Sequence, residues 1–105
     1  MLEVTFTVEE TGAEFVLDAT GHATLMHVAV ENDVPNIEGE CGGEMTCGTC
    51  HVHVASLPAG YDAPQSADEA DMLEVVNDPT PASRLSCQLP VGALVHGLRL
   101  RVPAL

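Results

Sequence analysis

The chain has 105 residues, the length of one small domain, so a two-domain enzyme is excluded and a single domain over residues 1–105 is expected. It carries 16 Asp and Glu against three Arg and no Lys, for a formal charge of −13. This charge speaks against nucleic acid as a partner and predicts attraction to basic surfaces.

The first half of the chain predicts a hairpin followed by a helix. Apolar and polar residues alternate over residues 2–8, which is typical of a half-buried strand. A short turn and the apolar run 15–17 follow, and the two segments together indicate an N-terminal β-hairpin. Within residues 22–32, apolar side chains recur at helical spacing, and Pro35 limits any continuation of that helix.

The second half predicts a loop, a helix and three short strands. Residues 36–50 contain four glycines and three of the four cysteines without periodicity, so we expect an irregular loop there, followed by a strand over 51–55. Ser66 to Glu69 match a capping box, which predicts a helix over about 67–76 with Met72 and Leu73 on its core side. The last two predicted strands span 84–88 and 96–102. The whole order predicts an α+β domain in which a mixed sheet packs on a helix.

The N-terminus and the lengths of the apolar stretches indicate the compartment. The N-terminus has no basic segment followed by an apolar one, and no stretch approaches the roughly 18 apolar residues of a membrane span. We therefore expect a cytoplasmic, bacterial-type protein that does not contact a membrane. Thiols stay reduced in the cytoplasm, so the cysteines indicate metal or redox chemistry.

The four cysteines follow the pattern C-x5-C-x2-C-x36-C, at Cys41, Cys47, Cys50 and Cys87. Three thiols in a Gly-rich loop plus one remote thiol suit a 2Fe-2S cluster, because four cysteines are its usual ligands. Glycines let the backbone approach closely and direct N–H groups at the cluster sulfurs. We expect one 2Fe-2S cluster, bound by all four thiols.

Three other uses of the cysteines fit less well. A four-cysteine zinc site usually pairs two short C-x2-C knuckles, and Cys41 and Cys87 belong to none. Disulfides do not suit the compartment. A thioredoxin-like pair at Cys47 and Cys50 would need to open a helix, whereas a strand is predicted directly after it.

The stretch 39–52, GECGGEMTCGTCHV, resembles the cluster loop of the adrenodoxin and putidaredoxin class of 2Fe-2S ferredoxins. The segments 69–74 and 83–88 agree with that class, and the five-residue first gap separates it from plant-type ferredoxins. The resemblance implies a β-grasp fold with an irregular cluster-binding loop. It also implies a one-electron carrier, not an enzyme, between an FAD-dependent NAD(P)H ferredoxin reductase and a cytochrome P-450 monooxygenase. We expect a monomer, because an obligate dimer interface would compete with docking and the sequence shows no extra apolar stripe.

The resemblance also implies roles for individual residues. Cys41 and Cys47 would bind one iron, and Cys50 and Cys87 the other. The backbone around the cluster would come from Gly42, Gly43, Glu44, Met45, Thr46, Gly48 and Thr49. Acids that would dock onto basic partner surfaces are Asp68, Glu69, Asp71 and Glu74. His51 is expected to hydrogen-bond toward the acidic helix. Independently of the resemblance, Arg84 is the only Lys or Arg near Cys87 in the sequence, and we expect it to form an internal ion pair, with partner docking as the alternative.

Two alternative functions stay open at this point. The C-x5-C-x2-C spacing also occurs in ferredoxins that serve iron-sulfur cluster biogenesis. A four-cysteine zinc-stabilised binding module with an acidic docking face is the alternative from another class. The acid excess is also compatible with a salt-adapted host, and the C-terminal Pro103-Ala104-Leu105 lacks the aromatic residue that some members of the class use in partner contact.

Overall fold

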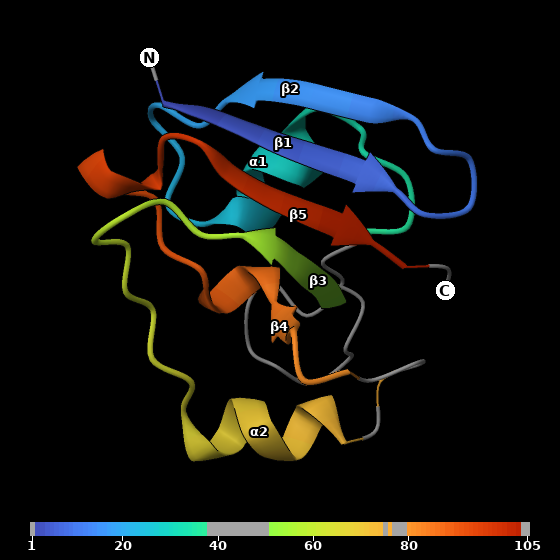
Figure 1. Cartoon of the computed structure of the whole chain (residues 1–105), viewed down its shortest axis with the longest axis vertical. Coiled ribbons are helices and arrows are strands. Elements are labelled where there is room, and N and C mark those ends of the chain that lie inside the picture. The colour runs from blue at the N-terminus through green and yellow to red at the C-terminus, as the bar shows by residue number, and fades with distance from the viewer. Residues whose placement is uncertain (1, 38–50, 75, 77–79, 104–105) are drawn as a thin grey trace.

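The computed structural model describes residues 2–37, 51–74, 76 and 80–103. Its elements, in chain order, are β1 Glu3–Val8, β2 Glu14–Asp18, α1 Leu25–Glu31, β3 His51–Ser56, α2 Ala67–Leu73, β4 Ser83–Leu85, the 3-10 turns η1 Ser86–Gln88 and η2 Ala93–Val95, and β5 Leu98–Val102. The strands form one sheet in the order β2-β1-β5-β3-β4, in which only the β1–β5 pair is parallel (Figure 1). The predicted hairpin and mixed sheet are confirmed.

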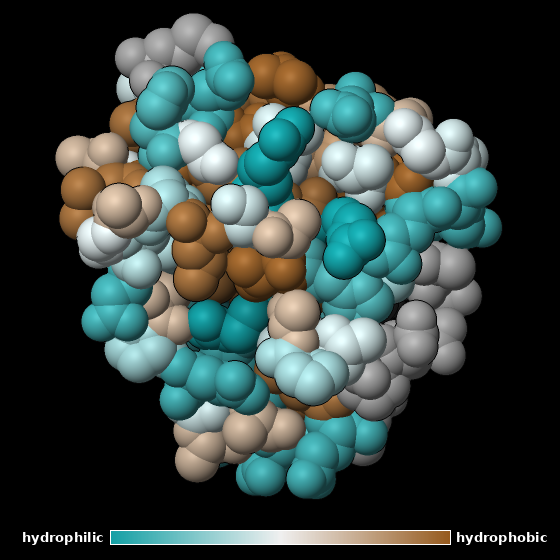
Figure 2. Space-filling view, in the orientation of Figure 1, coloured by the Kyte–Doolittle hydropathy of each residue, from teal (hydrophilic) through white to brown (hydrophobic). Residues whose placement is uncertain are grey.

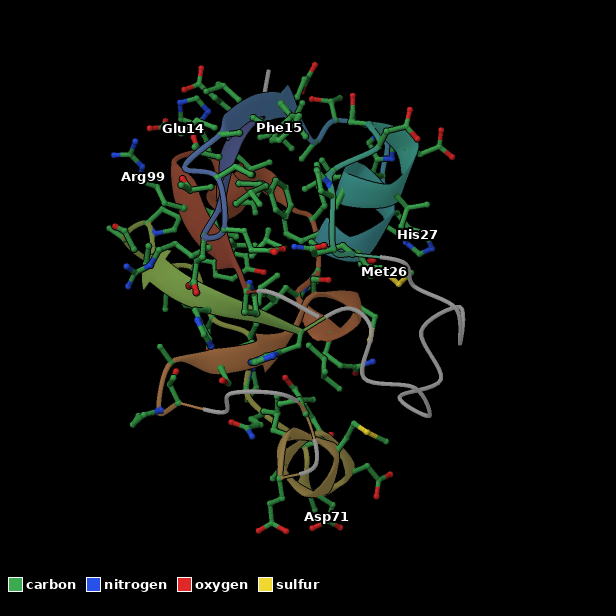
Figure 3. All side chains as sticks on the ribbon, turned by 90° about the vertical axis from the view of Figure 1, so that its right-hand side faces the viewer. Glu14, Phe15, Met26, His27, Asp71 and Arg99 are labelled. Atoms are coloured by element: carbon green, nitrogen blue, oxygen red, sulfur yellow. The ribbon has the colours of Figure 1, made fainter. Side chains whose placement is uncertain are left out.

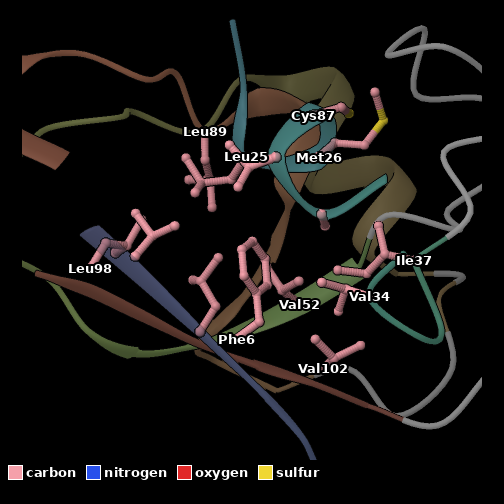
Figure 4. Packing of buried hydrophobic residues seen from close by; sticks show 14 of the residues in the cluster. Phe6, Leu25, Met26, Val34, Ile37, Val52, Cys87, Leu89, Leu98 and Val102 are labelled. Carbon is pink, nitrogen blue, oxygen red and sulfur yellow. The ribbon is translucent and has the colours of Figure 1, made fainter. Parts of the chain in front are cut away.

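The sheet buries one face under α1, and its other face carries polar side chains, some of them buried and some exposed. Val4, Phe6 and Val8 of β1 are buried on the inner face, as their alternation predicts. Figure 3 shows α1 on one side of the sheet, with Arg99 and Glu14 on the other. Aliphatic side chains pack around Phe6 in the space between sheet and helix (Figure 4). This core fixes β3 and β4, the two strands next to which cysteines lie in the sequence.

Helix α1 begins later than its pattern predicts. The prediction started at residue 22, whereas Thr24 is extended and acts as the N-cap, with its Oγ1 accepting from the His27 N–H. The cap is fixed from outside the helix as well, because Thr24 forms an isolated antiparallel bridge with Pro90. The predicted buried positions Leu25, Val28 and Ala29 are confirmed.

The predicted strand over 84–88 is wrong in its second half. β4 covers only Ser83–Leu85, and residues 86–88 form the 3-10 turn η1. Leu85, the last residue of β4, pairs with His51, the first residue of β3. After Leu85 the chain turns into η1, and the Leu89 N–H donates back to the Ser86 carbonyl (3.2 Å).

The remaining predicted helices and strands differ from their predictions only at their ends, and the 3-10 turn η2 was not predicted. Helix α2 begins as predicted, with Ser66 Oγ accepting from the Glu69 N–H (3.1 Å), but it ends at Leu73 instead of 76. β3 extends to Ser56 and β5 begins at Leu98. The loop predicted over 36–50 lies outside the described residues from position 38 on. Within the described part of the chain, no helix has both the length and the apolar character to cross a membrane.

Candidate metal centre

Cys87 is the one predicted ligand that the described residues include. It lies in η1, directly after β4, and its side chain is 6% exposed within the apolar cluster. Cys41, Cys47, Cys50 and the loop residues predicted to surround the cluster, Gly42, Gly43, Glu44, Met45, Thr46, Gly48 and Thr49, lie outside the described residues. The geometry of the site is therefore built from Cys87 and from the elements on either side of the loop.

The register of β3 and β4 relates the two cysteine-bearing segments. His51, which follows Cys50 in the sequence, pairs with Leu85, which precedes Cys87 by two residues. Because the two strands are antiparallel, the chain enters β3 at the same end of the sheet where it leaves β4. The fold thus directs the remote fourth cysteine to the end of the sheet where the three-cysteine segment joins β3 in the sequence.

The segment that carries Cys87 is held against α1 by backbone hydrogen bonds. The Leu25 N–H donates to the Leu89 carbonyl (3.0 Å), and the Val91 N–H donates to the Ala23 carbonyl (3.0 Å). Next to the thiol, the half-buried Gln88 places its Nε2 3.4 Å from Cys87 Sγ and donates to it. A cysteine sulfur that binds a metal is an anionic thiolate, which a nearby hydrogen-bond donor stabilises. The fixed backbone and the Gln88 donor therefore suit Cys87 to metal binding.

His51 has a structural role, as predicted, and one of its nitrogens bonds to β4. Its Nε2 lies 2.7 Å from Ser83 Oγ in β4, and the same Oγ accepts from the Thr80 N–H (2.8 Å). The His51 ring also meets His53 edge to face, with centroids 4.9 Å apart. This Nε2 thus contacts the strand that leads to Cys87.

The predicted ion pair of Arg84 is confirmed, and its partner is Glu69 of α2. Arg84 Nε lies 2.7 Å from Glu69 Oε2, and Nη2 lies 3.0 Å from Oε1, so the contact is bidentate. The Leu85 N–H also donates to Glu69 Oε2 (3.0 Å), and Arg84 Nη1 donates to the Ala63 carbonyl (2.6 Å). We call these four hydrogen bonds the Glu69–Arg84 latch; they join α2 and its preceding loop to β4.

The latch corrects one predicted docking acid. Glu69 is 1% exposed, so its carboxylate is not available on the surface. The other three predicted acids, Asp68, Asp71 and Glu74, are exposed. Asp71 points away from the body of the protein in Figure 3, and hydrophilic side chains cover much of α2 at the bottom of Figure 2. The acidic surface of α2 is therefore defined by Asp68, Asp71 and Glu74.

The burial of Glu69 had a signal in the sequence. It precedes Leu73 by four residues, and positions four apart lie on the same face of a helix. Leu73 was assigned to the core side, so Glu69 had to face the same way. The sequence reasoning missed this because it read Glu69 as part of a capping box, in which its side chain would turn back toward residue 66.

The loop between β3 and α2 is attached through Tyr61. Its hydroxyl donates to the Pro90 carbonyl (2.8 Å), which places the loop against the segment that follows η1. Burial raises the pKa of Tyr61 above its ordinary value, and the nearby Arg84 charge opposes that rise. Tyr61 is therefore a neutral donor at physiological pH.

Three other histidines each make a hydrogen bond to a neighbouring polar group in the fold. His27 Nδ1 lies 2.7 Å from Thr24 Oγ1, His53 Nδ1 lies 2.8 Å from Glu9 Oε2, and His96 Nδ1 accepts from the Glu3 N–H (3.0 Å). Among the described residues, no three His, Cys, Asp or Glu side chains come together in a way that could hold a metal ion. Within the described part of the chain, Cys87 is thus the side chain whose chemistry favours binding a metal.

Comparison with known proteins identifies a family and close relatives. A family model described as a 2Fe-2S iron-sulfur cluster binding domain matches residues 6–92. Terpredoxin from a Pseudomonas species is 38% identical over 97 residues, which cover 91% of this chain and 92% of the relative. Ferredoxin CarAc from a Sphingomonas species is 43% identical over 94 residues, covering 88% and 84%.

A solved structure agrees with the fold over almost the whole chain. It is the crystal structure of the covalent complex between putidaredoxin reductase and putidaredoxin, and the match has a TM-score of 0.83 at 34% identity. The match covers 98% of this chain and 99% of the other. The similarity therefore extends over the sheet, both helices and the segment that carries Cys87.

Proposed function

The chain belongs to the 2Fe-2S ferredoxin family, and we propose that it passes single electrons from an FAD-dependent NAD(P)H ferredoxin reductase to a cytochrome P-450 monooxygenase. As a member of this family it binds one 2Fe-2S cluster and is an electron carrier, not an enzyme. Its five strands and covering helix are the β-grasp arrangement that the resemblance implied. The proposal concerns its ligands, its partners and its docking surface.

We propose that the cluster is held by Cys41, Cys47, Cys50 and Cys87, with the backbone of residues 42–49 around it. The single observation that carries this assignment is the β3–β4 register, which directs Cys87 to the end of the sheet where the segment 38–50 joins it. The cluster supplies one-electron chemistry when bound. The chain supplies the thiolates, keeps Cys87 out of water and fixes η1 against α1.

The docking surface that we propose is the acidic surface of α2, at Asp68, Asp71 and Glu74. These side chains are exposed, whereas the buried carboxylate of Glu69 attaches the same helix to β4. An acidic surface attracts basic partners, speeds their encounter and allows rapid release. The latch reaches the N–H of Leu85, two residues before Cys87, so a partner on this surface would lie close in the fold to a proposed ligand.

A reductase partner is supported by the relative that was solved in covalent complex with its own reductase. By analogy, we propose that reductase and monooxygenase both dock at the acidic surface of α2, one after the other. We also propose that residues 1–105 form one domain that works as a monomer in the bacterial cytoplasm. A mass measured by light scattering at working concentration tests the monomer.

The test is stopped-flow mixing of the anaerobically reduced protein with ferric, CO-saturated cytochrome P-450 enzymes from the same host. The ferrous carbonyl band should appear rapidly with one of them and more slowly as salt rises. In the variant Asp71→Asn/Glu74→Gln the second-order rate constant should fall roughly threefold to tenfold. The matched control, Glu14→Gln/Glu31→Gln, makes the same charge change at exposed sites on β2 and α1 and should leave the rate unchanged.

Two outcomes would overturn the proposal. If no monooxygenase is reduced while a host reductase still reduces the protein, the acceptor lies elsewhere, and cluster biogenesis becomes the better assignment. If the control variant slows transfer as much as the α2 variant, net charge and not the acidic surface of α2 governs docking.

A further inference from the structure

Gln88 makes a contact with Cys87 that the proposed function does not require. Its Nε2 lies 3.4 Å from Cys87 Sγ and donates to it. Ordinary ligation needs only the thiolate, so a side-chain donor at this position has to be explained separately. The chain has one other glutamine, Gln65, which is exposed in the loop before α2 and provides a natural comparison.

The local structure holds this donor in place. η1 is a tight turn closed by the Leu89 N–H on the Ser86 carbonyl, and it brings the Gln88 side chain back over the preceding residue. Leu89 is itself bound by the Leu25 N–H of α1, and its side chain is fully buried. Gln88 is half-buried, so its amide is partly shielded from water that would otherwise compete for the sulfur.

The effect of such a donor depends on the charge of the sulfur. Reduction adds an electron to the cluster, and part of that negative charge falls on the ligating thiolates. A hydrogen bond to an ionised acceptor is stronger than one to a neutral acceptor, so a fixed N–H donor stabilises the reduced state more than the oxidised state. Hydrogen bonds to the sulfurs are among the factors that determine the reduction potential of these centres.

We infer that Gln88 is a positioning residue that raises the reduction potential by donating its Nε2–H to Cys87 Sγ. This inference rests on the proposed assignment of Cys87 as a ligand. Gln88 thereby determines which reductants can load the protein and how readily it passes an electron on. Its contribution is electrostatic, so it acts without contacting either redox partner.

The first experiment compares midpoint potentials of the loaded protein by spectroelectrochemical titration. Gln88→Met keeps the length of the side chain and removes the donor, and the equilibrium constant for reduction should fall about threefold to tenfold, where tenfold equals about 59 mV for one electron. Gln88→Glu is isosteric, also lacks the amide donor and adds a negative charge, so its fall should be larger. The matched control Gln65→Met should keep the parent potential.

The second experiment detects the hydrogen bond itself and needs no substitution at Gln88. In the Gln65→Met background, Gln88 is the only glutamine, so selective 15N labelling of the glutamine side chain marks its Nε2 alone. Pulsed EPR of the reduced cluster should then show a weak 15N coupling and an exchangeable proton coupling. A side chain that only fills space would produce no such coupling.

The outcomes separate this inference from the function on which it rests. Equal potentials in Gln88→Met and Gln65→Met, with the cluster intact, would overturn the role of Gln88 and leave the ligand assignment standing. Absence of the 15N coupling would also overturn it. If Cys87→Ser bound the cluster with an unchanged spectrum, the ligand assignment itself would fail, and the inference would fail with it.

Discussion

The two helices have the same length and the same kind of N-cap, but they are attached to the sheet in different ways. Each has seven residues and begins at a hydroxyl side chain, Thr24 for α1 and Ser66 for α2. α1 buries four apolar side chains, whereas α2 buries only Leu73 and the charged Glu69. Apolar burial attaches α1, and the Glu69–Arg84 latch largely attaches α2.

This difference explains how one small chain can present an acidic surface and still fold. A helix attached by a broad apolar face must devote most of its positions to the core. A bidentate ion pair needs only one position of α2, which leaves Asp68, Asp71 and Glu74 free to face solvent. The attachment is also directional, because the latch ends on the backbone of Leu85 and so orients α2 relative to the Cys87 segment.

The largest expected loss of stability comes from removing one partner of the ion pair in the Glu69–Arg84 latch. Arg84→Leu leaves the carboxylate of Glu69 buried without its cation, and removing one partner of a buried pair costs about 3–5 kcal/mol. Urea unfolding of the loaded protein should report a loss near 4 kcal/mol, with α2 amides losing protection from hydrogen exchange first.

The double variant Glu69→Gln/Arg84→Leu is the control for this prediction. It removes both charges and keeps a carbonyl acceptor for the Leu85 N–H, so most of the stability should return. A single Arg84→Leu variant that loses less than about 0.5 kcal/mol, which is the range of ordinary surface substitutions, would contradict the view that the latch attaches α2.

The next largest loss of stability should come from a substitution on the core face of α1. Leu25 is fully buried, and Leu25→Ala should cost about 3 kcal/mol through lost apolar burial and a residual cavity. Val30→Ala on the exposed side of the same helix should stay within about 0.5 kcal/mol. Unlike the Arg84 variant, Leu25→Ala should lower protection across the sheet. Loss confined to α1 would show that the helix is less integrated into the core than its burial indicates.

Most of the fold was predictable because it depends on periodic apolar burial. The alternation in residues 2–8 and the helical spacing around Leu25 each determine which face is buried, and both predictions are confirmed. Residues 86–88 were predicted wrongly as strand. The local pattern does not reveal that the chain turns into η1 directly after Leu85, the residue of β4 that pairs with His51.

The candidate site shows how far sequence reasoning reaches in chemistry and in electrostatics. The spacing predicts four cysteine ligands, of which the described residues include only Cys87. The position of Arg84 near Cys87 predicted its internal ion pair, which is confirmed, but not the partner of that pair. Glu69 was grouped with its acidic neighbours, although its spacing of four residues from Leu73 places it on the buried face of α2. The sequence does not show the cation that pairs with it there. That cation lies 15 residues further along the chain, and the packing of α2 against β4 brings it within 2.7 Å.

Substitutions at the two N-caps should have smaller effects on stability, and these effects should differ between the two helices. Thr24→Ala and Ser66→Ala each remove a side-chain acceptor at an N-terminus, which costs about 1 kcal/mol. The α2 amides should then exchange faster in Ser66→Ala by local opening, because few apolar contacts hold that helix. In Thr24→Ala the α1 amides should exchange only with global unfolding. Equal local opening in both variants, measured by native-state hydrogen exchange, would remove the contrast between the helices.

The smallest effect on stability should come from the exposed acids of α2. In Asp71→Asn/Glu74→Gln the free energy of unfolding should change by less than about 0.5 kcal/mol, because both side chains are exposed and take no part in the latch. Glu69→Gln, two residues before Asp71, should cost several times more because it leaves the mostly buried Arg84 without its carboxylate. A large loss from the exposed pair would mean that these acids also support the fold. A small loss, combined with slower electron transfer, would separate the surface that binds partners from the residue that attaches it.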